Sequence, residues 1–360
     1  MNQSITVRVI ERIDHGASLA REWEALVKGN TASGIMQSLH WRDMKANQGL
    51  MPFHVGVFNG DILIAGAIFY TSLKRNGVGL LVAPEGPVLP WHDEDLARES
   101  LRLIIDCVRE RSEELGVMAI RIEPRIAPAP PRILREFSRG PVDLVPFETL
   151  YIDLEQDSES ILAAMKPKGR YNIKLAEKHG VTVMQENSVE AVGRFYSVMQ
   201  QVSVRDGFAV EPLSFFEKLA GGLCARGCLR LSFAEHEGDL LGASMMAVYG
   251  ERATYLYGGI TNIKRNLMGG YALQWAAMMA AKTDGCSTYD FYGFDAFRSV
   301  EHPYARFSQF KSQFGGTPMR FIGAHELFFT DKVADAFVRL ANEASSFHEP
   351  KSMLVGAHSD

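Results

Sequence analysis

The chain has 360 residues and a formal net charge of −5, with 46% hydrophobic and 22% charged residues. This balance is typical of a globular protein, and the negative net charge argues against broad, unspecific binding to nucleic acid but leaves room for a local basic patch. At roughly 150 residues per domain, the length predicts two domains.

No apolar run reaches the roughly 18 residues that would span a membrane, and the first residues lack the apolar core of a signal peptide. We therefore expect a cytoplasmic protein. The four cysteines, Cys107, Cys224, Cys228 and Cys286, are too few and too irregular for a disulfide framework. Without a second Cys or His pair at zinc spacing, we expect buried thiols and no metal.

The hydrophobic pattern predicts two blocks with the same order of elements: a hairpin, a strand, a long helix and a strand. In the first block these elements are residues 53–70, 78–84, about 93–116 and 118–124. In the second they are residues 229–249, 252–260, about 269–285 and 287–294. The repetition predicts an internal duplication.

We predict an α/β fold with mixed sheets, in two tandem domains at 1–145 and 146–345 with a flexible tail at 346–360. The boundary follows a Pro-rich stretch, APAPPR. The plan is similar to the GNAT acetyltransferase fold, with the active site expected between the two domains. Acyl-CoA enzymes of that fold carry a pyrophosphate-binding loop before the long helix. Here Arg265–Gly270 has the residue types of that loop but not the spacing.

Three sets of residues resemble the FemABX family of aminoacyltransferases, in particular its small members without a helical arm. They are Gln37-Ser38 with Trp41, Lys45 and Gly86-Pro87; the basic helix at 170–176 with Arg205-Asp206-Gly207; and Tyr255–Gly259, Leu273-Gln274-Trp275, Tyr289–Phe294 and Phe307–Gly316. The sets keep the family's order across about 290 residues. Glu85 departs from the pattern, because a basic residue is expected before Gly86-Pro87.

The resemblance implies transfer of an aminoacyl group from a charged tRNA to an amine of a muramyl-peptide precursor, with no cofactor. This reaction is the aminolysis of an activated ester, so the protein must mainly position the reactants and stabilise an oxyanion. The implied partners are therefore aminoacyl-tRNA and the precursor. Oligomeric state is not indicated.

The resemblance also implies roles for single residues. Lys311 and its neighbour Phe310 are the implied catalytic residues, and Lys311 contacts the tRNA end and stabilises the tetrahedral intermediate. Lys45 and Arg205 hold the pyrophosphate of the nucleotide-linked precursor, and Tyr257, Trp41 and Asp93 belong to the same substrate site. The segment from Lys166 to Lys178 is rich in basic residues, so Lys168, Arg170 and Lys174 are candidate contacts to an anion or tRNA.

Each role has a structural alternative. The spacing of Phe307, Phe310 and Phe314 is equally typical of an amphipathic helix with these rings in the core and Lys311 at the surface. Asp93 is equally placed to cap the helix that follows it. Tyr257 fits a packing residue, and the basic segment fits a solvated helix face. Two other functions remain open: an N-acyltransferase that uses acetyl-CoA, and a binding protein for the precursor or tRNA without turnover.

Overall fold

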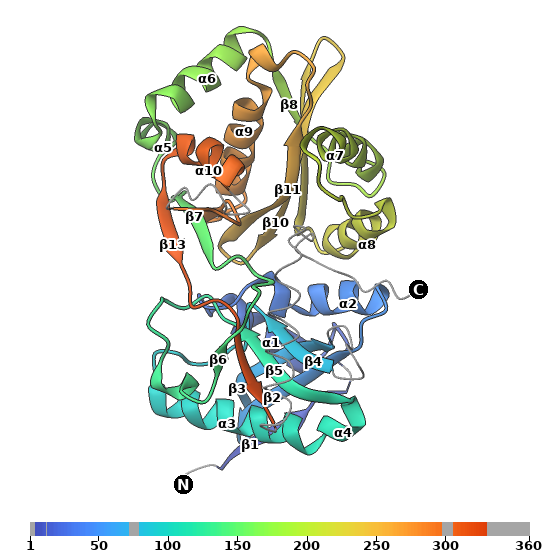
Figure 1. Cartoon of the computed structure of the whole chain (residues 1–360), viewed down its shortest axis with the longest axis vertical. Helices are drawn as coiled ribbons and strands as arrows, with labels where there is room; N and C mark the ends of the chain where they lie inside the picture. Colours follow the sequence, from blue (N-terminus) through green and yellow to red (C-terminus); the bar gives the residue numbers. More distant parts are fainter. Residues whose placement is uncertain (1–3, 12, 72–78, 297–304, 330–360) are drawn as a thin grey trace. The chain divides into compact units, whose positions relative to one another are not determined.

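The structure is a computed structural model that describes residues 4–11, 13–71, 79–296 and 305–329 (Figure 1). The chain divides into two compact units. Unit 1 comprises residues 1–147 and 320–360, and unit 2 comprises residues 148–319. The predicted tail at 346–360 lies outside the described residues.

Unit 1 has a seven-stranded sheet in the order β1-β2-β3-β4-β5-β14-β6. The strands are β1 (Ile5–Val9), β2 (Pro52–Asn59), β3 (Ile62–Thr71), β4 (Gly79–Pro84), β5 (Val117–Glu123), β6 (Ser138–Arg139) and β14 (His325–Phe328). Strands β4 and β5 are parallel, and the other neighbours are antiparallel. The helices are α1 (Ser18–Lys28), η1 (Ile35–Gln37), α2 (Leu39–Asn47), α3 (Glu94–Glu110), α4 (Ser112–Leu115) and η2 (Arg132–Leu134).

Unit 2 also has a seven-stranded sheet, in the order β13-β7-β12-β11-β10-β9-β8. Its strands are β7 (Glu148–Asp153), β8 (Thr182–Gln185), β9 (Leu229–His236), β10 (Asp239–Tyr249), β11 (Arg252–Ile260), β12 (Thr288–Asp290) and β13 (Thr317–Arg320). Its helices are α5 (Ser158–Ala164), α6 (Pro167–Lys178), α7 (Val192–Asp206), α8 (Leu213–Cys224), η3 (Arg265–Leu267), α9 (Gly269–Thr283), α10 (Ala305–Lys311) and η4 (Ser312–Phe314).

The two units repeat one topology, which confirms the predicted duplication and the mixed-sheet α/β fold. From β1 to β5 in unit 1 and from β8 to β12 in unit 2, the chain runs through a strand, two α-helices, three antiparallel strands, a long helix and a final strand parallel to the one before it. Each hairpin also carries a bulge, with Ile64 as the extra residue in β3 and Leu241 in β10. The two units therefore share their topology down to the bulge in the hairpin.

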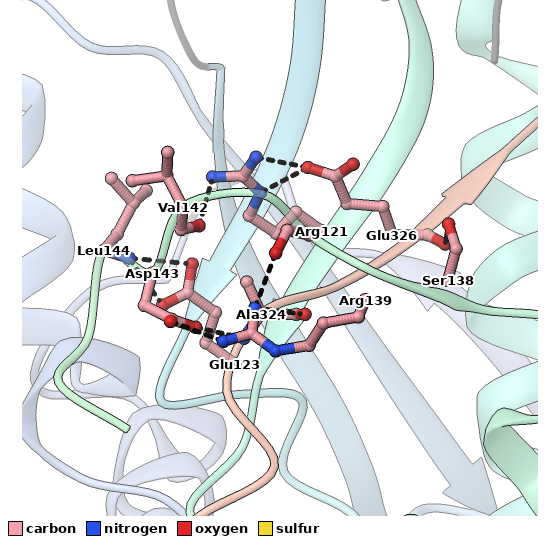
Figure 2. A network of polar contacts seen from close by, with 10 residues as sticks. Arg121, Glu123, Ser138, Arg139, Val142, Asp143, Leu144, Ala324 and Glu326 are labelled. Carbon is pink, nitrogen blue, oxygen red and sulfur yellow. Dashed lines mark hydrogen bonds and ion pairs between the residues drawn. The ribbon is translucent and has the colours of Figure 1, made fainter. Parts of the chain in front are cut away.

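The C-terminal boundary differs from the predicted domain at 146–345, because residues 320–329 belong to unit 1. Strand β14 pairs with β5 and places Glu326 opposite Arg121, with which it forms a buried salt bridge (Figure 2). Asp143 accepts a hydrogen bond from the Ala324 N–H at 2.7 Å. A short strand from late in the chain, β14, therefore lies between β5 and β6 in the first sheet. The sequence has no periodic pattern that predicts this pairing.

Candidate functional site

Two residues of the first motif place helix α2 in unit 1. The Gln37 amide donates to the carbonyls of Ile68 (3.1 Å) and Pro84 (2.9 Å), and its oxygen accepts from the Ile68 N–H (2.9 Å). Ser38 caps α2 by accepting a hydrogen bond from the Trp41 N–H at 3.1 Å. The motif therefore fixes the start of α2 against β3 and the end of β4.

Helix α2 carries Trp41 and Lys45 one turn apart. Trp41 is fully buried, and its indole N–H has no hydrogen-bond partner among the described residues. Lys45 is 6% exposed, and its Nζ lies 5.7 Å from the centre of the Trp41 ring, within reach of a cation–π interaction. The structure thus brings this pair together, while its contact with substrate remains a prediction.

Glu85 has an internal role in unit 1. It is buried, accepts a hydrogen bond from the Met36 N–H at 3.1 Å and pairs with the buried Arg125 at 3.3 Å. The carboxylate thereby links the ends of β4 and β5 to η1. This explains why an acidic residue stands before Gly86-Pro87.

Asp93 is the N-cap of α3 and accepts a hydrogen bond from the Leu96 N–H at 3.1 Å. This contact is the structural alternative considered for Asp93. Its place in the substrate site remains a prediction.

In unit 2, Lys311 ends α10 and is only 7% exposed, so the alternative of a surface lysine is wrong. Its Nζ donates to the backbone carbonyls of Phe291 (2.8 Å), Tyr292 (2.9 Å) and Gly293 (2.6 Å). An ammonium has three N–H donors, and these carbonyls occupy all three. In this conformation Lys311 fixes a stretch of backbone, and it has no donor left for an oxyanion.

The surroundings of Lys311 shift its protonation equilibrium. Burial lowers the pKa of Lys311 to about 7, while the nearby carboxylate of Asp290 acts in the opposite direction. The Nζ lies 5.8 Å from the centre of the Tyr255 ring. Asp290 is itself buried and accepts hydrogen bonds from the Thr149 hydroxyl and the Tyr292 N–H.

Phe310 packs into an aromatic cluster beside Lys311. Its ring centre lies 5.1 Å from that of Tyr271 and 5.2 Å from that of Phe314, and Phe314 in turn contacts Phe291. Phe307 is instead exposed at 46%, so it does not belong to the core as the amphipathic-helix alternative required. The cluster explains the spacing of Phe310 and Phe314, while a catalytic role for Phe310 remains a prediction.

Lys311 lies where two parallel strands separate. The pairing of β11 with β12 covers only Arg252–Thr254 and Thr288–Asp290, although β11 continues to Ile260. After Asp290 the chain turns through Tyr292 (φ 47°) and Gly293 (φ 84°). The Lys311 ammonium holds this turn, in which Tyr292 occupies a left-handed conformation that is uncommon for a residue with a Cβ.

A bulge in β11 separates two tyrosines that simple alternation would place on one face of the sheet. Met245 pairs with Tyr257 and Met246 with Tyr255, so Leu256 is the extra residue. Tyr255 lies near Lys311, whereas the Tyr257 ring lies 5.1 Å from that of Phe216 in α8. Figure 1 shows α7 and α8 on one face of this sheet and α6, α9 and α10 on the other.

Tyr257 and Arg205 therefore belong to the face opposite Lys311. Burial raises the pKa of Tyr257 well above its ordinary value, so its hydroxyl stays protonated. Arg205, in the last turn of α7, pairs with Asp206 through Nε (2.7 Å) and a terminal nitrogen (2.6 Å), and donates to the Ile260 carbonyl. These contacts fix the guanidinium, and its pyrophosphate role remains a prediction.

The three candidate cations of α6 differ in their surroundings. Arg170 donates to the carbonyls of Ala163 (3.1 Å) and Met165, and so ties α6 to the end of α5. Lys168 and Lys174 are exposed. The structure thus assigns Arg170 a structural contact and leaves the two lysines at the surface.

Tyr255 and Asp290 lie near Lys311 and fall in stretches that carry the family resemblance, but the sequence assigned neither of them a role. A signal existed for Asp290, because an acidic residue inside the otherwise apolar stretch STYDFYGF is expected to be buried with a partner. Tyr255 gave no comparable signal, since the bulge that turns it toward Lys311 depends on strand pairing. Within the described parts of the chain, no group of three or more His, Cys, Asp or Glu side chains is placed to hold a metal.

Among the described helices, none has the length and apolar character needed to cross a bilayer. Two family models match the chain: the FemAB family over residues 19–129 and the acetyltransferase (GNAT) domain over residues 166–306. The matches fall in units 1 and 2 respectively.

Curated relatives include Lipid II:glycine glycyltransferases. That of Staphylococcus saprophyticus is 21% identical over 347 residues, covering 76% of this chain and 82% of the relative. That of a Staphylococcus aureus strain is 21% identical over 355 residues, covering 76% and 83%.

Solved structures show the same fold. The crystal structure of FemX has a TM-score of 0.80 at 18% identity, covering 91% of this chain and 99% of that one. A tandem GNAT protein from the clavulanic acid biosynthesis pathway has a TM-score of 0.55 at 11% identity, covering 90% and 98%. Both support a fold of two GNAT-like units.

Proposed function

We propose that this member of the FemABX family, an acyl- or aminoacyl-transfer enzyme, moves an amino acid from aminoacyl-tRNA to an amine of a peptidoglycan-precursor peptide. The proposal is supported by the glycyltransferase relatives, because each match covers most of this chain and most of the relative. It would place the protein in peptidoglycan biosynthesis. The observation that carries it in this chain is the buried Lys311 at the separation of β11 and β12.

In the proposed reaction, a neutral amine attacks the ester carbonyl of the aminoacyl-tRNA. The carbon–oxygen bond to the ribose breaks, the ribose oxygen takes up a proton, and an amide bond forms. The chain contributes mainly placement and electrostatics. Lys311 holds the Phe291–Gly293 turn through three hydrogen bonds, so in this conformation it acts as a positioning residue rather than as a direct donor.

Two cations are the proposed contacts to the phosphate groups of the acceptor. Lys45 and Arg205 provide positive charge for phosphate oxygens, and a guanidinium suits such oxygens particularly well. Trp41, Tyr257 and Asp93 complete the proposed substrate site.

A second candidate, an acyl-CoA-dependent N-acyltransferase, is supported by the GNAT-domain match over residues 166–306. The start of α9 does not add support for it. A Cβ on Gly269 would lie 3.0 Å from Leu241, and one on Gly270 would lie 3.0 Å from Ile260. Close packing against these side chains therefore explains why both positions are glycine, without a bound phosphate.

The two candidates can be separated by supplying the protein with a mixture of charged tRNAs and with muramyl-peptide or simple amine acceptors. Transfer of labelled amino acid to the acceptor, followed by mass spectrometry, is the expected result. Acylation with acetyl-CoA alone would replace the first candidate by the second. Binding of precursor or tRNA without transfer would indicate a binding protein.

A further inference from the structure

Helix α6 presents an exposed face on which an aromatic ring stands between positive charges. Tyr171 is 64% exposed, and Lys168 and Lys174 lie three residues before and after it on the same side of the helix. The helix carries four basic residues against one acidic residue, in a chain whose net charge is −5. This face therefore concentrates positive charge on a negatively charged protein.

The opposite face of α6 is fixed in unit 2. Gly169, Asn172, Ile173 and Ala176 are buried, and a Cβ on Gly169 would lie 2.3 Å from the Gln313 carbonyl oxygen. The Gln313 carbonyl also accepts a hydrogen bond from the Lys166 N–H at 3.0 Å. The helix is thus packed against the segment that follows Lys311, and this packing fixes the direction in which its exposed face points.

We propose that Tyr171, with Lys168 and Lys174, binds an unpaired 3′ end of RNA by stacking a base on the tyrosine ring. This inference rests on the proposed function, in which RNA carries the amino acid. Single-stranded nucleic acids are bound by exposed aromatic rings on which bases stack, together with cations that follow the phosphates. A base inside a duplex is already stacked on its neighbours, so an exposed ring distinguishes an unpaired end from a paired one.

A lipid surface fits this face less well. Helices that lie on membranes bury a broad apolar face, whereas the exposed side of α6 offers one aromatic ring among lysines. Because stacking needs only the face of a base, the contact would be tolerant of sequence.

The test measures fluorescence anisotropy with a labelled RNA hairpin ending in four unpaired 3′ nucleotides and with the same hairpin made blunt. We expect the wild-type protein to prefer the tailed hairpin, and Tyr171→Ala to weaken that binding about tenfold. Tyr171→Phe should retain it, since the ring remains. Met184→Ala, at another exposed apolar residue of unit 2, is the matched control and should leave affinity unchanged.

The lysines are tested through salt dependence, because each phosphate contact releases counterions. Lys168→Ala and Lys174→Ala should each reduce the slope of log affinity against log salt by roughly 0.7. Equal binding of blunt and tailed hairpins, or unchanged affinity in Tyr171→Ala, would overturn the inference.

This outcome can be told apart from failure of the proposed function. A protein that binds the tailed hairpin through Tyr171 but transfers no amino acid refutes the proposed function alone. A protein that transfers the amino acid equally well with Tyr171→Ala refutes the role of α6 alone.

Discussion

The Nζ atom of Lys311 lies 2.6 Å from the carbonyl oxygen of Gly293, three residues after the end of β12, the shortest described strand of unit 2's sheet. The carbonyls of Phe291 and Tyr292 complete its shell. The side chain of a helical lysine thereby holds the backbone of a turn that lies about 20 residues earlier in the chain. Stability and activity should therefore respond together to changes at Lys311.

We expect Lys311→Ala to lower the free energy of unfolding by about 3 kcal/mol, because three buried carbonyls lose their donor. Turnover should also fall strongly. Lys311→Arg should be impaired too, since a planar guanidinium does not reproduce the compact shell of an ammonium. Urea unfolding and initial-rate measurements test both variants.

The matched control is Lys218→Ala, at an exposed lysine of α8. It should change neither stability nor turnover. If Lys311→Ala unfolds like the wild type and loses only turnover, Lys311 acts directly on the reactants and not through the turn.

The sequence predicted the repeated topology because hydrophobic periodicity and turn residues are local signals. It located both hairpins and both long helices, whereas the functional role of Lys311 stays a prediction. It missed β14, since a four-residue strand from the far end of the chain carries no pattern of its own. It also missed the separation of Tyr255 from Tyr257, because the bulge at Leu256 exists only once β10 and β11 pair.

Arg205 and Asp206 provide a test of phosphate recognition. We expect Arg205→Ala to weaken binding of a nucleotide-linked precursor without a large change in melting temperature. Asp206→Asn should instead strengthen binding, because it removes the negative charge that now competes for the guanidinium. Calorimetric titration measures both affinities, and weaker binding in both variants would indicate that the pair acts as one structural unit.

Lys45 tests the same proposal in unit 1. Lys45→Met retains an apolar stem of similar length against Trp41 but removes the charge. We expect weaker binding of the nucleotide-linked precursor and a steeper loss at low ionic strength, where charge contacts are strongest. An affinity that is unchanged at every salt concentration would show that Lys45 serves packing alone.

Gly169 tests whether α6 and the Lys311 segment depend on each other. A Cβ at this position meets the Gln313 backbone carbonyl oxygen at 2.3 Å, so Gly169→Ala must displace the helix from that segment. We expect a loss of about 2 kcal/mol in unfolding free energy, as is typical of overpacking. Gly193→Ala, in α7 with open space around the site, is the control and should not destabilise the protein.

Glu123 gives a pH dependence whose sign follows from its surroundings in unit 1 (Figure 2). Burial raises the pKa of Glu123 from 4.5 to about 7, against the opposing effect of the Val145 and Leu144 N–H groups that donate to it. Between these two values the unfolded chain has lost its proton while the folded chain retains it, so folding stability from this group falls as pH rises. We therefore expect Glu123→Gln to gain stability relative to the wild type between pH 4.5 and about 7, by up to about 3 kcal/mol. Urea unfolding at several pH values measures the difference, with the exposed Glu99→Gln as control. A difference that stays constant across this range would show that Glu123 is ionised in the folded protein well below pH 7.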